Sequence, residues 1–478
     1  MTLLAGSPVR KATGTGAGPG EVLTIVCAGV ILASLDLFIV NVALPQIARD
    51  LHASHLSALS WVLNAYAIVY ASLLVFFGRL ADRCRRDRAF LLGVAVFTAA
   101  SAACAASTSV GMLVAFRVIQ AAGAALLTPT SLGLVLASYE PGRRHGAVRA
   151  WTAMGGLAAA IGPVIGGLLL TASWRWVFLV NVPVGLIALV VGWRRLPPVP
   201  GRPTTRPDAA GVVLATAGVG LLTFGLVQGP DWGWSSVWTG AILIAGAVML
   251  ATFVGHCRRA RSPLVSPELF RSREFTVASI IALSFSAAFG AMLLSIVLWE
   301  QGTWGWSALQ AGLAISPGPL MVPVMSFLVA GRLIRRYGAA AVITLGSLAY
   351  GAGVVWWALA VTTAPNYLSG VLGGMILTGV GVGLTLPTLM ATGTASLPAH
   401  AFATGSAVIN MIRQTGLALG VAALVAVLGT SADGTAGLVT FQHAWWLIAA
   451  LSFAGILPAV ALLRTPHPAD HPDIGAAP

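Results

Sequence analysis

The sequence contains few charged residues. Asp, Glu, Lys and Arg together make up 9% of its 478 residues, whereas 57% are hydrophobic. A soluble domain carries roughly a quarter charged residues. The composition, with a mean hydropathy of +0.89, therefore excludes an ordinary soluble protein and predicts one that crosses a membrane many times.

Cysteine is also scarce, and the short motifs of several enzyme classes are missing. No GxxxxGK[ST] phosphate loop occurs, so ATP-driven transport is not supported, and no HExxH, CxxC or Ser-His-Asp pattern stands out. We therefore expect neither an enzyme nor a bound cofactor or metal. The four cysteines lack metal-ligand spacing, which predicts free thiols: Cys27, Cys84, Cys104 and Cys257. The first twenty residues are glycine-rich and polar, without the features of a cleavable signal peptide.

Long apolar runs, by contrast, are abundant. A membrane-spanning helix needs about 20 mostly apolar residues, and fourteen runs meet this requirement. They predict an all-α membrane protein with fourteen transmembrane helices. The predicted spans are 22–44, 60–80, 90–108, 112–138, 147–172, 177–196, 209–228, 237–256, 275–300, 308–331, 339–361, 366–392, 404–429 and 441–463.

The basic residues provide an independent test of this count. When the loops alternate across the membrane, 23 of the 27 Lys and Arg residues fall on the side of the N-terminus. Cytoplasmic loops carry an excess of Lys and Arg, so both termini are predicted to be cytoplasmic in a multi-pass cell-membrane protein. Topology thus accounts for the net charge of +13, and no nucleic-acid partner is predicted.

Short segments recur in the second half of the chain at offsets of 253 to 258 residues: Gly78-Arg-Leu at Gly331, Pro129-Thr at Pro387, and Gly162 at Gly420. Repeated halves are typical of secondary transporters, which bind substrate between them. The offset of eight spans predicts two six-helix bundles separated by an inserted helix pair. The predicted divisions are a cytoplasmic tail (1–21), an N-terminal bundle (22–196), a linker with the inserted pair (197–270), a C-terminal bundle (271–464) and a second cytoplasmic tail (465–478).

Asp36 lies inside the first apolar run. A carboxylate at that depth costs about 3 kcal/mol or more, so a membrane helix keeps one only for a reason. Two interpretations follow. Asp36 is either a protonation site in a transport pathway or a structural contact to a neighbouring helix.

Arg117 in the fourth span poses a similar problem, because an arginine cannot lose its proton in hydrocarbon. It needs a partner or a water-filled cavity, and Asp36 is the natural candidate since no other acid lies deep in the first half. The alternative is a structural arginine bonded to backbone carbonyls. Gln120 follows it by three residues, in the segment Arg117-Val-Ile-Gln120-Ala-Ala-Gly123.

Two glycine-containing segments add to this pattern. After the second span, Gly78-Arg-Leu-Ala-Asp82-Arg83 combines a glycine that permits close helix approach with an acid that can accept hydrogen bonds. In the fifth span, glycines let helices touch and a proline produces a bend: Gly162, Pro163, Gly166 and Gly167.

These segments, with LDLFIVNVALP at residues 35–45, resemble motifs of the fourteen-helix drug:proton antiporters of the major facilitator superfamily over nearly the whole chain. The resemblance implies proton transfer at Asp36 and Arg117, a gate latch at Gly78 and Asp82, and an exporter hinge at Gly162–Gly167. Arg85 stands where the latch motif has its second glycine, which puts its tight turn in doubt.

In the second half, Glu300 at the outer end of the ninth span has two interpretations: a second protonation or cation-attracting site, or, slightly favoured, a solvated residue in an aromatic belt. Further candidates for a substrate pocket, each of which can equally be a lipid or packing residue, are Asn41, Trp151, Met154, Phe289, Asn410, Arg413 and Gln414.

We therefore predict a monomeric, proton-coupled exporter of amphipathic small molecules such as drugs, antibiotics and dyes, working by rocker-switch alternating access. Its partners are the substrate, protons and the lipid bilayer. The alternatives are a dedicated exporter of one metabolite or self-made antibiotic, and a non-transporting sensor on a transporter scaffold.

Overall fold

The computed structural model describes residues 17–53, 55–201, 207–398, 401–429 and 437–463. Within these residues no β-strand occurs, and fourteen helical segments are long and apolar enough to cross a membrane. Each coincides with one of the predicted spans, so the predicted fold class is confirmed. The C-terminal tail and most of the N-terminal tail lie outside the described residues, as do five of the basic residues used above: Arg10, Lys11, Arg202, Arg206 and Arg464.

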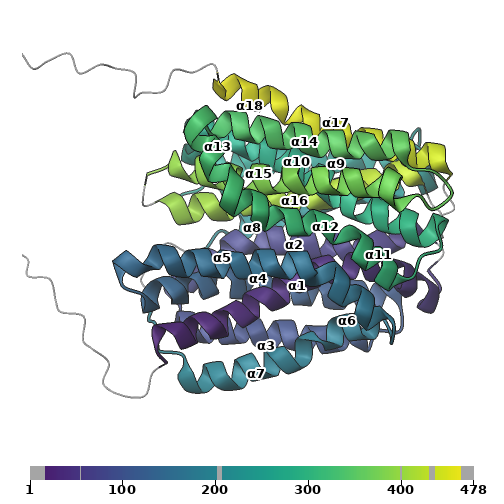
Figure 1. The fold of residues 1–478 in the computed structure, drawn as a ribbon. Coiled ribbons are helices and arrows are strands. Elements are labelled where there is room, and N and C mark those ends of the chain that lie inside the picture. The colour runs from purple at the N-terminus through teal and green to yellow at the C-terminus, as the bar shows by residue number, and fades with distance from the viewer. Residues whose placement is uncertain (1–16, 54, 202–206, 399–400, 430–436, 464–478) are drawn as a thin grey trace, which may run out of the picture.

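The first six spans form an N-terminal bundle, drawn in purple to teal in Figure 1. Prolines lie inside three of its helices, where each removes one backbone hydrogen bond: Pro45, Pro129 and Pro163. The helices are α1 (Pro19–Asp50), α2 (Leu56–Arg83), α3 (Arg86–Ala105), α4 (Val110–Ser138), the 3₁₀ turn η1 (Pro141–Arg143), α5 (Arg144–Leu170), α6 (Arg175–Leu179) and α7 (Asn181–Arg195).

The last six spans form a C-terminal bundle, drawn in green to yellow. Its second span is broken into short pieces near Pro317 and Pro323, because proline cannot continue the backbone hydrogen-bond ladder. The elements are η2 (Pro267–Arg271), α10 (Arg273–Leu298), η3 (Trp299–Thr303), α11 (Ala308–Ile315), α12 (Pro317–Pro323), η4 (Val324–Val329), α13 (Ala330–Tyr337), α14 (Ala339–Ala360), η5 (Tyr367–Leu372), α15 (Gly373–Ala395), α16 (Phe402–Leu428), α17 (Leu438–Ala454) and α18 (Ile456–Leu463).

The two bundles repeat the same packing. In the first, α1 packs along α5 and α3 along α4; in the second, α10 packs along α16 and α14 along α15. These are among the most extensive helix contacts in the protein. The bundles meet where α2 packs on α16, α5 on α11 and α12, and α1 on α10. The recurring segments of the sequence therefore correspond to repeated structure.

The inserted pair consists of α8 (Ala209–Trp232) and α9 (Val237–Arg259), which pack on each other. α8 also packs on α2 and α16, so it covers the seam between the bundles. Only 11% of the most apolar stretch of α9 is buried inside the protein, so most of this helix faces outward, where a bilayer would surround it.

Asp208 fixes the start of the inserted pair. Its carboxylate accepts hydrogen bonds from the N–H groups of Gly211 and Leu264, both at 2.8 Å, and lies 2.9 Å from Nε2 of His256. Burial raises the pKa of the Asp208 carboxyl, but these hydrogen bonds outweigh it and leave the pKa below its ordinary value.

Most described arginines lie at one end of the molecule, which we call the basic face. It is formed where α2, α7, α9 and α13 end and where α3, α5 and α10 begin, at the left in Figure 1. The other end, with α6 and the start of α11, is called the opposite face. The basic face is the side that the sequence predicts to be cytoplasmic.

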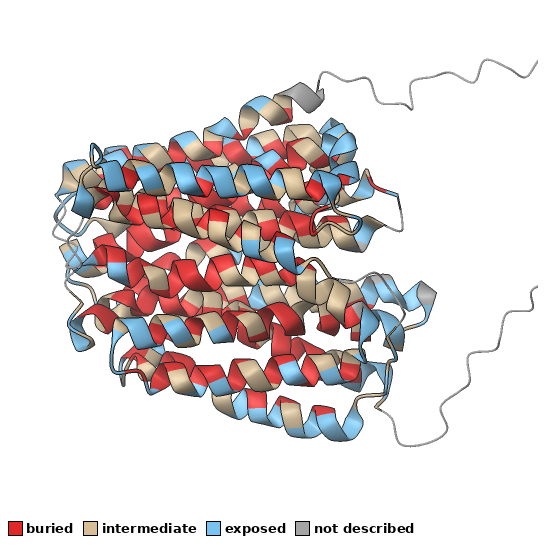
Figure 2. Cartoon of the chain, turned by 180° about the vertical axis from the view of Figure 1, so that it is seen from behind, coloured by how far each residue is buried: buried red, intermediate tan, exposed pale blue. Residues whose placement is uncertain are grey.

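Burial follows the expected membrane pattern. Buried residues fill the middle of both bundles, and exposed ones follow the outer helices (Figure 2). Many exposed residues are large and apolar, such as Trp193 and Leu368, each 78% exposed. Soluble monomers rarely present such surfaces, whereas a bilayer accommodates them.

Candidate functional site

The Asp36 carboxylate lies at the centre of a polar cluster between α1, α3, α4 and α7. Arg117 donates to its Oδ2 from α4 through Nη1, and Gln120 Nε2 donates to Oδ1 at 2.9 Å. Asn181 Nδ2 donates to Oδ1 from the start of α7 at 3.4 Å. Arg117 and Gln120 share one face of α4 because they are three residues apart. The structure therefore brings together the acid and the arginine that the sequence singled out.

Several groups besides Asp36 hold Arg117. Its Nε donates to the carbonyl of Val62 at 3.1 Å, and Nη1 also donates to Gln120 Oε1 at 2.7 Å. The guanidinium carbon lies 4.1 Å from the centre of the Tyr66 ring, a cation–π arrangement. Nη2 has no hydrogen-bond partner. The arginine thus keeps one donor atom unused beside an otherwise complete set of contacts.

The cluster includes residues that the sequence analysis did not select. Ser101 on α3 accepts from Gln120 Nε2 at 2.8 Å and donates to the Phe97 carbonyl. Asn181 lies in a segment, Trp174–Pro183, that resembles a further motif of the same transporters, but it is not among the predicted site residues. Tyr66 is one aromatic among many. A lone serine or tyrosine in an apolar run carries no signal that distinguishes it from a packing residue.

The Asp36–Arg117 pair is fully buried on both sides. A buried pair of opposite charges replaces two isolated charges by a neutral unit, but each ion still gives up its hydration. Removing either charge therefore leaves the other uncompensated. A proton added to Asp36 has the same effect as removing its charge.

A small central cavity of about 40 Å³ adjoins the cluster between the two bundles. Arg117 lines it, together with Asn41 of α1 and Phe289 of α10 among the predicted residues. Asn64 also lines it, and neither amide atom of this side chain has a hydrogen-bond partner. Phe38 faces Phe289 across the seam with ring centres 6.3 Å apart. The remaining lining residues are apolar or small: Leu37, Leu63, Ala67, Gly290, Leu293, Leu417, Ala418 and Val421.

The other predicted pocket residues lie outside this cavity lining. Trp151 donates from Nε1 to Ser131 Oγ at 3.0 Å within the N-terminal bundle, and Met154 lies half-buried one turn later. On α16, Arg413 donates to Asn410 Oδ1 at 3.2 Å, while Gln414 Oε1 is buried without a partner. This group precedes the cavity residue Leu417 by about one turn.

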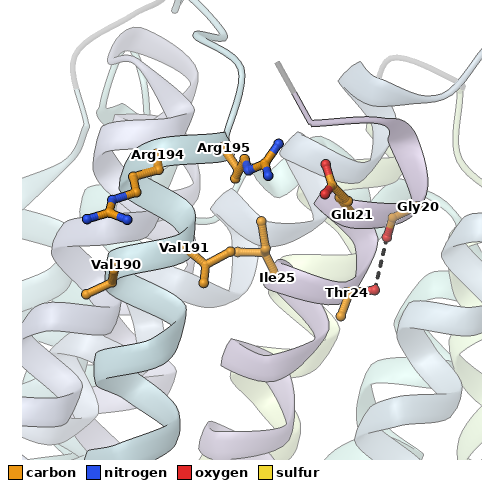
Figure 3. A pocket seen from close by; sticks show the side chains of 8 residues that line it. All are labelled: Gly20, Glu21, Thr24, Ile25, Val190, Val191, Arg194 and Arg195. Carbon is orange, nitrogen blue, oxygen red and sulfur yellow. Dashed lines mark hydrogen bonds between the residues drawn. The ribbon is translucent and has the colours of Figure 1, made fainter. Parts of the chain in front are cut away.

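A larger groove, of about 700 Å³, opens on the basic face between the start of α1 and the end of α7 (Figure 3). It is lined by the polar residues Glu21, Thr24, Arg194 and Arg195 and by small or apolar residues of these two helices. All of them belong to the N-terminal bundle, so this groove is separate from the seam between the bundles.

Glu300 is fully buried, which makes the favoured interpretation of a solvated belt residue wrong. It lies in the π-helical turn η3, where the chain leaves α10. The residue position alone placed it near the membrane surface. Tertiary packing, which linear hydropathy does not report, decides its exposure.

The loop after α2 differs in part from its predicted form. A Cβ added to Gly78 would lie 3.8 Å from its nearest neighbour, Pro129, so the predicted close helix approach there is wrong. The turn is extended at Cys84 and Arg85, with φ of −100° and −65°, so no glycine is required at Arg85. Arg83 is exposed, and the side chain of Asp82 lies outside the described part of the chain.

The glycines of α5 do make the predicted close contacts. A Cβ on Gly162 or Gly166 would lie 3.0–3.1 Å from Phe38 or Ile39 of α1. On Gly167 it would lie 2.7 Å from Ala308 and Leu309, in the other bundle. The Pro163 carbonyl in turn fills the space beside Gly312 of α11. α5 therefore joins the two bundles toward the opposite face.

Known proteins resemble this chain both in sequence and in fold. The sequence pattern described as Major Facilitator Superfamily matches residues 26–421. The chain belongs to the Major Facilitator Superfamily. A cephamycin export protein of Amycolatopsis lactamdurans is 34% identical over 98% of each chain. A tetracenomycin C resistance and export protein of Streptomyces glaucescens is 31% identical over 91% of this chain and 79% of its own.

Solved structures also agree with this fold. A crystallised POT family transporter, PepTSo, superposes with a TM-score of 0.70 over 93% of this chain and 98% of its own, at 16% identity. This likeness concerns the fold alone. Together the findings describe a multi-pass membrane transporter of the Major Facilitator Superfamily.

Proposed function

We infer that this protein is a proton-coupled antiporter that exports amphipathic small molecules. The observation that carries this inference is the double role of Arg117, which forms the ion pair with Asp36 and also lines the cavity between the bundles. A change of charge on Asp36 is thereby transmitted directly to the surface that substrate would contact.

The coupling follows from the chemistry of the pair. Arg117 keeps its charge under all physiological conditions, so only Asp36 can bind and release a proton. A proton on Asp36 cancels its attraction for the guanidinium and leaves Arg117 as an uncompensated charge beside the cavity. Arrival of a proton then disfavours cationic substrate and favours rearrangement, and proton release restores the pair.

The size of the cavity supports alternating access. Ligand pockets measure roughly 300–1,000 Å³, far more than the cavity of about 40 Å³. Substrate therefore enters only when the bundles separate along the seam. In this structure α5 and α11 are in close contact toward the opposite face, which corresponds to a state closed on that side. We assign the basic face to the cytoplasm. We also propose that the two predicted bundles, residues 22–196 and 271–464, are the units that move.

The export direction and substrate class draw on the relatives, whose names describe export of or resistance to antibiotics. Several of these names specify a single antibiotic. A dedicated exporter of one compound is therefore the second candidate. The apolar lining with two amides, Asn41 and Asn64, suits an amphipathic molecule in either case.

The decisive experiment measures export in proteoliposomes under an imposed pH gradient, with a panel of amphipathic drugs and dyes. Asp36→Asn removes the titratable group but keeps size and hydrogen bonding, so uphill export should be lost while substrate binding remains. Asp50→Asn at the exposed end of α1 is the matched control and should transport normally.

Full uphill export by the Asp36→Asn variant would contradict the proposal. Export of one compound only, with coupling intact, would favour the dedicated exporter.

A further inference from the structure

Three acidic side chains are buried among the described residues: Asp36, Asp87 and Glu300. Asp36 receives the donors described above. Asp87 accepts from Arg85 at 2.6 Å and from the Val199 N–H at 3.2 Å. Glu300 differs from both, because neither of its carboxyl oxygens has a hydrogen-bond partner.

The turn that carries Glu300 is flanked by aromatic residues. Its neighbour Trp299 packs edge-on against Phe441 and Trp445 of α17. Beyond the turn, the rings of Trp304 and Trp306 lie 5.0 Å apart.

Tyr367 is the titratable side chain that interacts electrostatically with Glu300. The centre of its ring lies 5.9 Å from that of Trp306. Its hydroxyl donates to the Ala314 carbonyl at 2.9 Å and not to the Glu300 carboxyl. On α1, Asp36 is paired with Arg117, and Arg49 and Asp50 are exposed at the helix end. Among the described residues, no hydrogen-bond donor contacts the Glu300 carboxyl to compensate a negative charge there.

An ionised carboxylate buried without a partner is strongly disfavoured, and such a group takes up a proton instead. In this closed arrangement Glu300 is therefore protonated. The same carboxyl in contact with water would be ionised at neutral pH, since the ordinary pKa of glutamate is about 4.3. Its protonation state thus depends on whether the surrounding structure is closed.

The neighbouring residue links this turn to the seam between the bundles. Gln301 Nε2 donates to the Val42 carbonyl of α1 at 3.0 Å, across from the C-terminal to the N-terminal bundle. Separation of the bundles at the opposite face breaks this bond and gives water access to the turn. π-helical turns such as η3 occur frequently at functional sites.

We propose that Glu300 is a second proton-binding site, which must take up a proton from the opposite face before the bundles can close there. Closure then binds one proton, and each pH unit of acidification favours the closed state about tenfold. The site is distinct from Asp36, which keeps its partners in the closed state. The proposal rests on the inferred alternating access, but it requires no proton-driven export.

The test measures opening of the opposite face as a function of pH. Spin labels at Thr108→Cys and Thr363→Cys, both exposed on the opposite face of different bundles, report the distance in the full-length protein with Cys84→Ser. In the otherwise unchanged protein, the open-to-closed ratio should rise about tenfold per pH unit. Glu300→Gln should remain closed with no such dependence, and Glu300→Asp should retain it.

Controls separate this site from others. Glu268→Gln, at an exposed carboxyl near the start of α10, should leave the pH dependence intact. Infrared spectroscopy should detect a protonated carboxyl in the closed protein that Glu300→Gln lacks.

Unchanged pH dependence in Glu300→Gln, or no protonated carboxyl in the closed protein, would overturn the proposal. If pH-dependent closure is present but proton-driven export is absent, the inferred antiport fails and this proposal stands.

Discussion

Replacing Arg117 by methionine tests how the buried ion pair contributes to stability. The change removes the positive charge and leaves Asp36 at zero exposure, with only the amides of Gln120 and Asn181 as donors. Breaking a buried pair by removing one partner costs about 3–5 kcal/mol. Asp36 can limit this cost by taking up a proton. For an acid of ordinary pKa about 3.9, that step costs about 4 kcal/mol at pH 7.

The two estimates agree, and the second predicts a pH dependence. In Arg117→Met the folded state binds one proton more than the unfolded state near neutral pH. Its free energy of unfolding should therefore increase by about 1.4 kcal/mol for each pH unit of acidification. Asp36→Asn should lose a similar amount of stability with no such recovery, because Arg117 cannot give up its proton. The double variant, with neither charge, should regain most of the loss.

The measurement is unfolding of the purified protein in detergent between pH 5 and pH 8. Arg413→Met is a matched control, because the hydrogen-bond partner of this half-buried arginine is the neutral Asn410. It should show no added pH dependence. If Arg117→Met is as stable as the parent protein, or if its loss is the same at every pH, the ion pair does not have the role assigned to it.

Three further predictions concern the contact between α5 and α11, the topology and the inserted pair. In Gly167→Val, the new Cβ would lie only 2.7 Å from the carbonyl oxygen of Ala308. Such overpacking costs about 1–3 kcal/mol, so the variant should shift toward opening at the opposite face and export less. Gly156→Ala on the same helix is the control, because its Cβ would meet nothing within 4 Å. Cys84 is exposed and should react with an impermeant thiol reagent only from the cytoplasmic side, since labelling in intact cells would reverse the assigned orientation, whereas Cys257 is buried and should react slowly from either side. Because the pKa of Asp208 is lowered in the folded protein, its ionised carboxylate stabilises the fold above the ordinary pKa of Asp, near 3.9. This contribution is lost as the pH falls through the pKa that Asp208 has in the folded protein. Asp208→Ala should therefore lower the free energy of unfolding by about 1–3 kcal/mol at pH 7, with a smaller difference at pH 3.

The sequence predicted the fold and the centre of the candidate site because both depend on strong, local signals. Fourteen long apolar runs and the alternation of arginines define the spans without knowledge of packing. Asp36 and Arg117 are conspicuous because a charge is costly at that depth in the membrane. With no other acid deep in the first half of the sequence, Asp36 is also the natural partner of Arg117. Ser101, Tyr66 and Asn64 are not conspicuous, because their side chains are common in spans and acquire a role only from the helices beside them.

Glycine shows the same limit at finer resolution. Gly78 and Gly167 both belong to recognisable segments, yet only Gly167 lies where another backbone excludes a side chain. The difference depends on which helix passes opposite, a property of the tertiary arrangement of α5 and α11. A sequence pattern identifies positions where close approach is permitted, and it does not identify those where it occurs.

Two of the buried acids, Asp36 and Glu300, differ in what surrounds them. Asp36 sits in the first bundle with an arginine and two amides, so its charge is stabilised while the seam is closed. Glu300 sits in the second bundle with no donor, so it enters the closed state only with a proton. The packing repeats between the halves, but the polar partners do not. An acid that is paired when buried can be charged in the closed state, whereas an unpaired one enters that state only as the neutral acid. This asymmetry fits the two roles proposed above, a coupling site at Asp36 and a proton site linked to closure at Glu300.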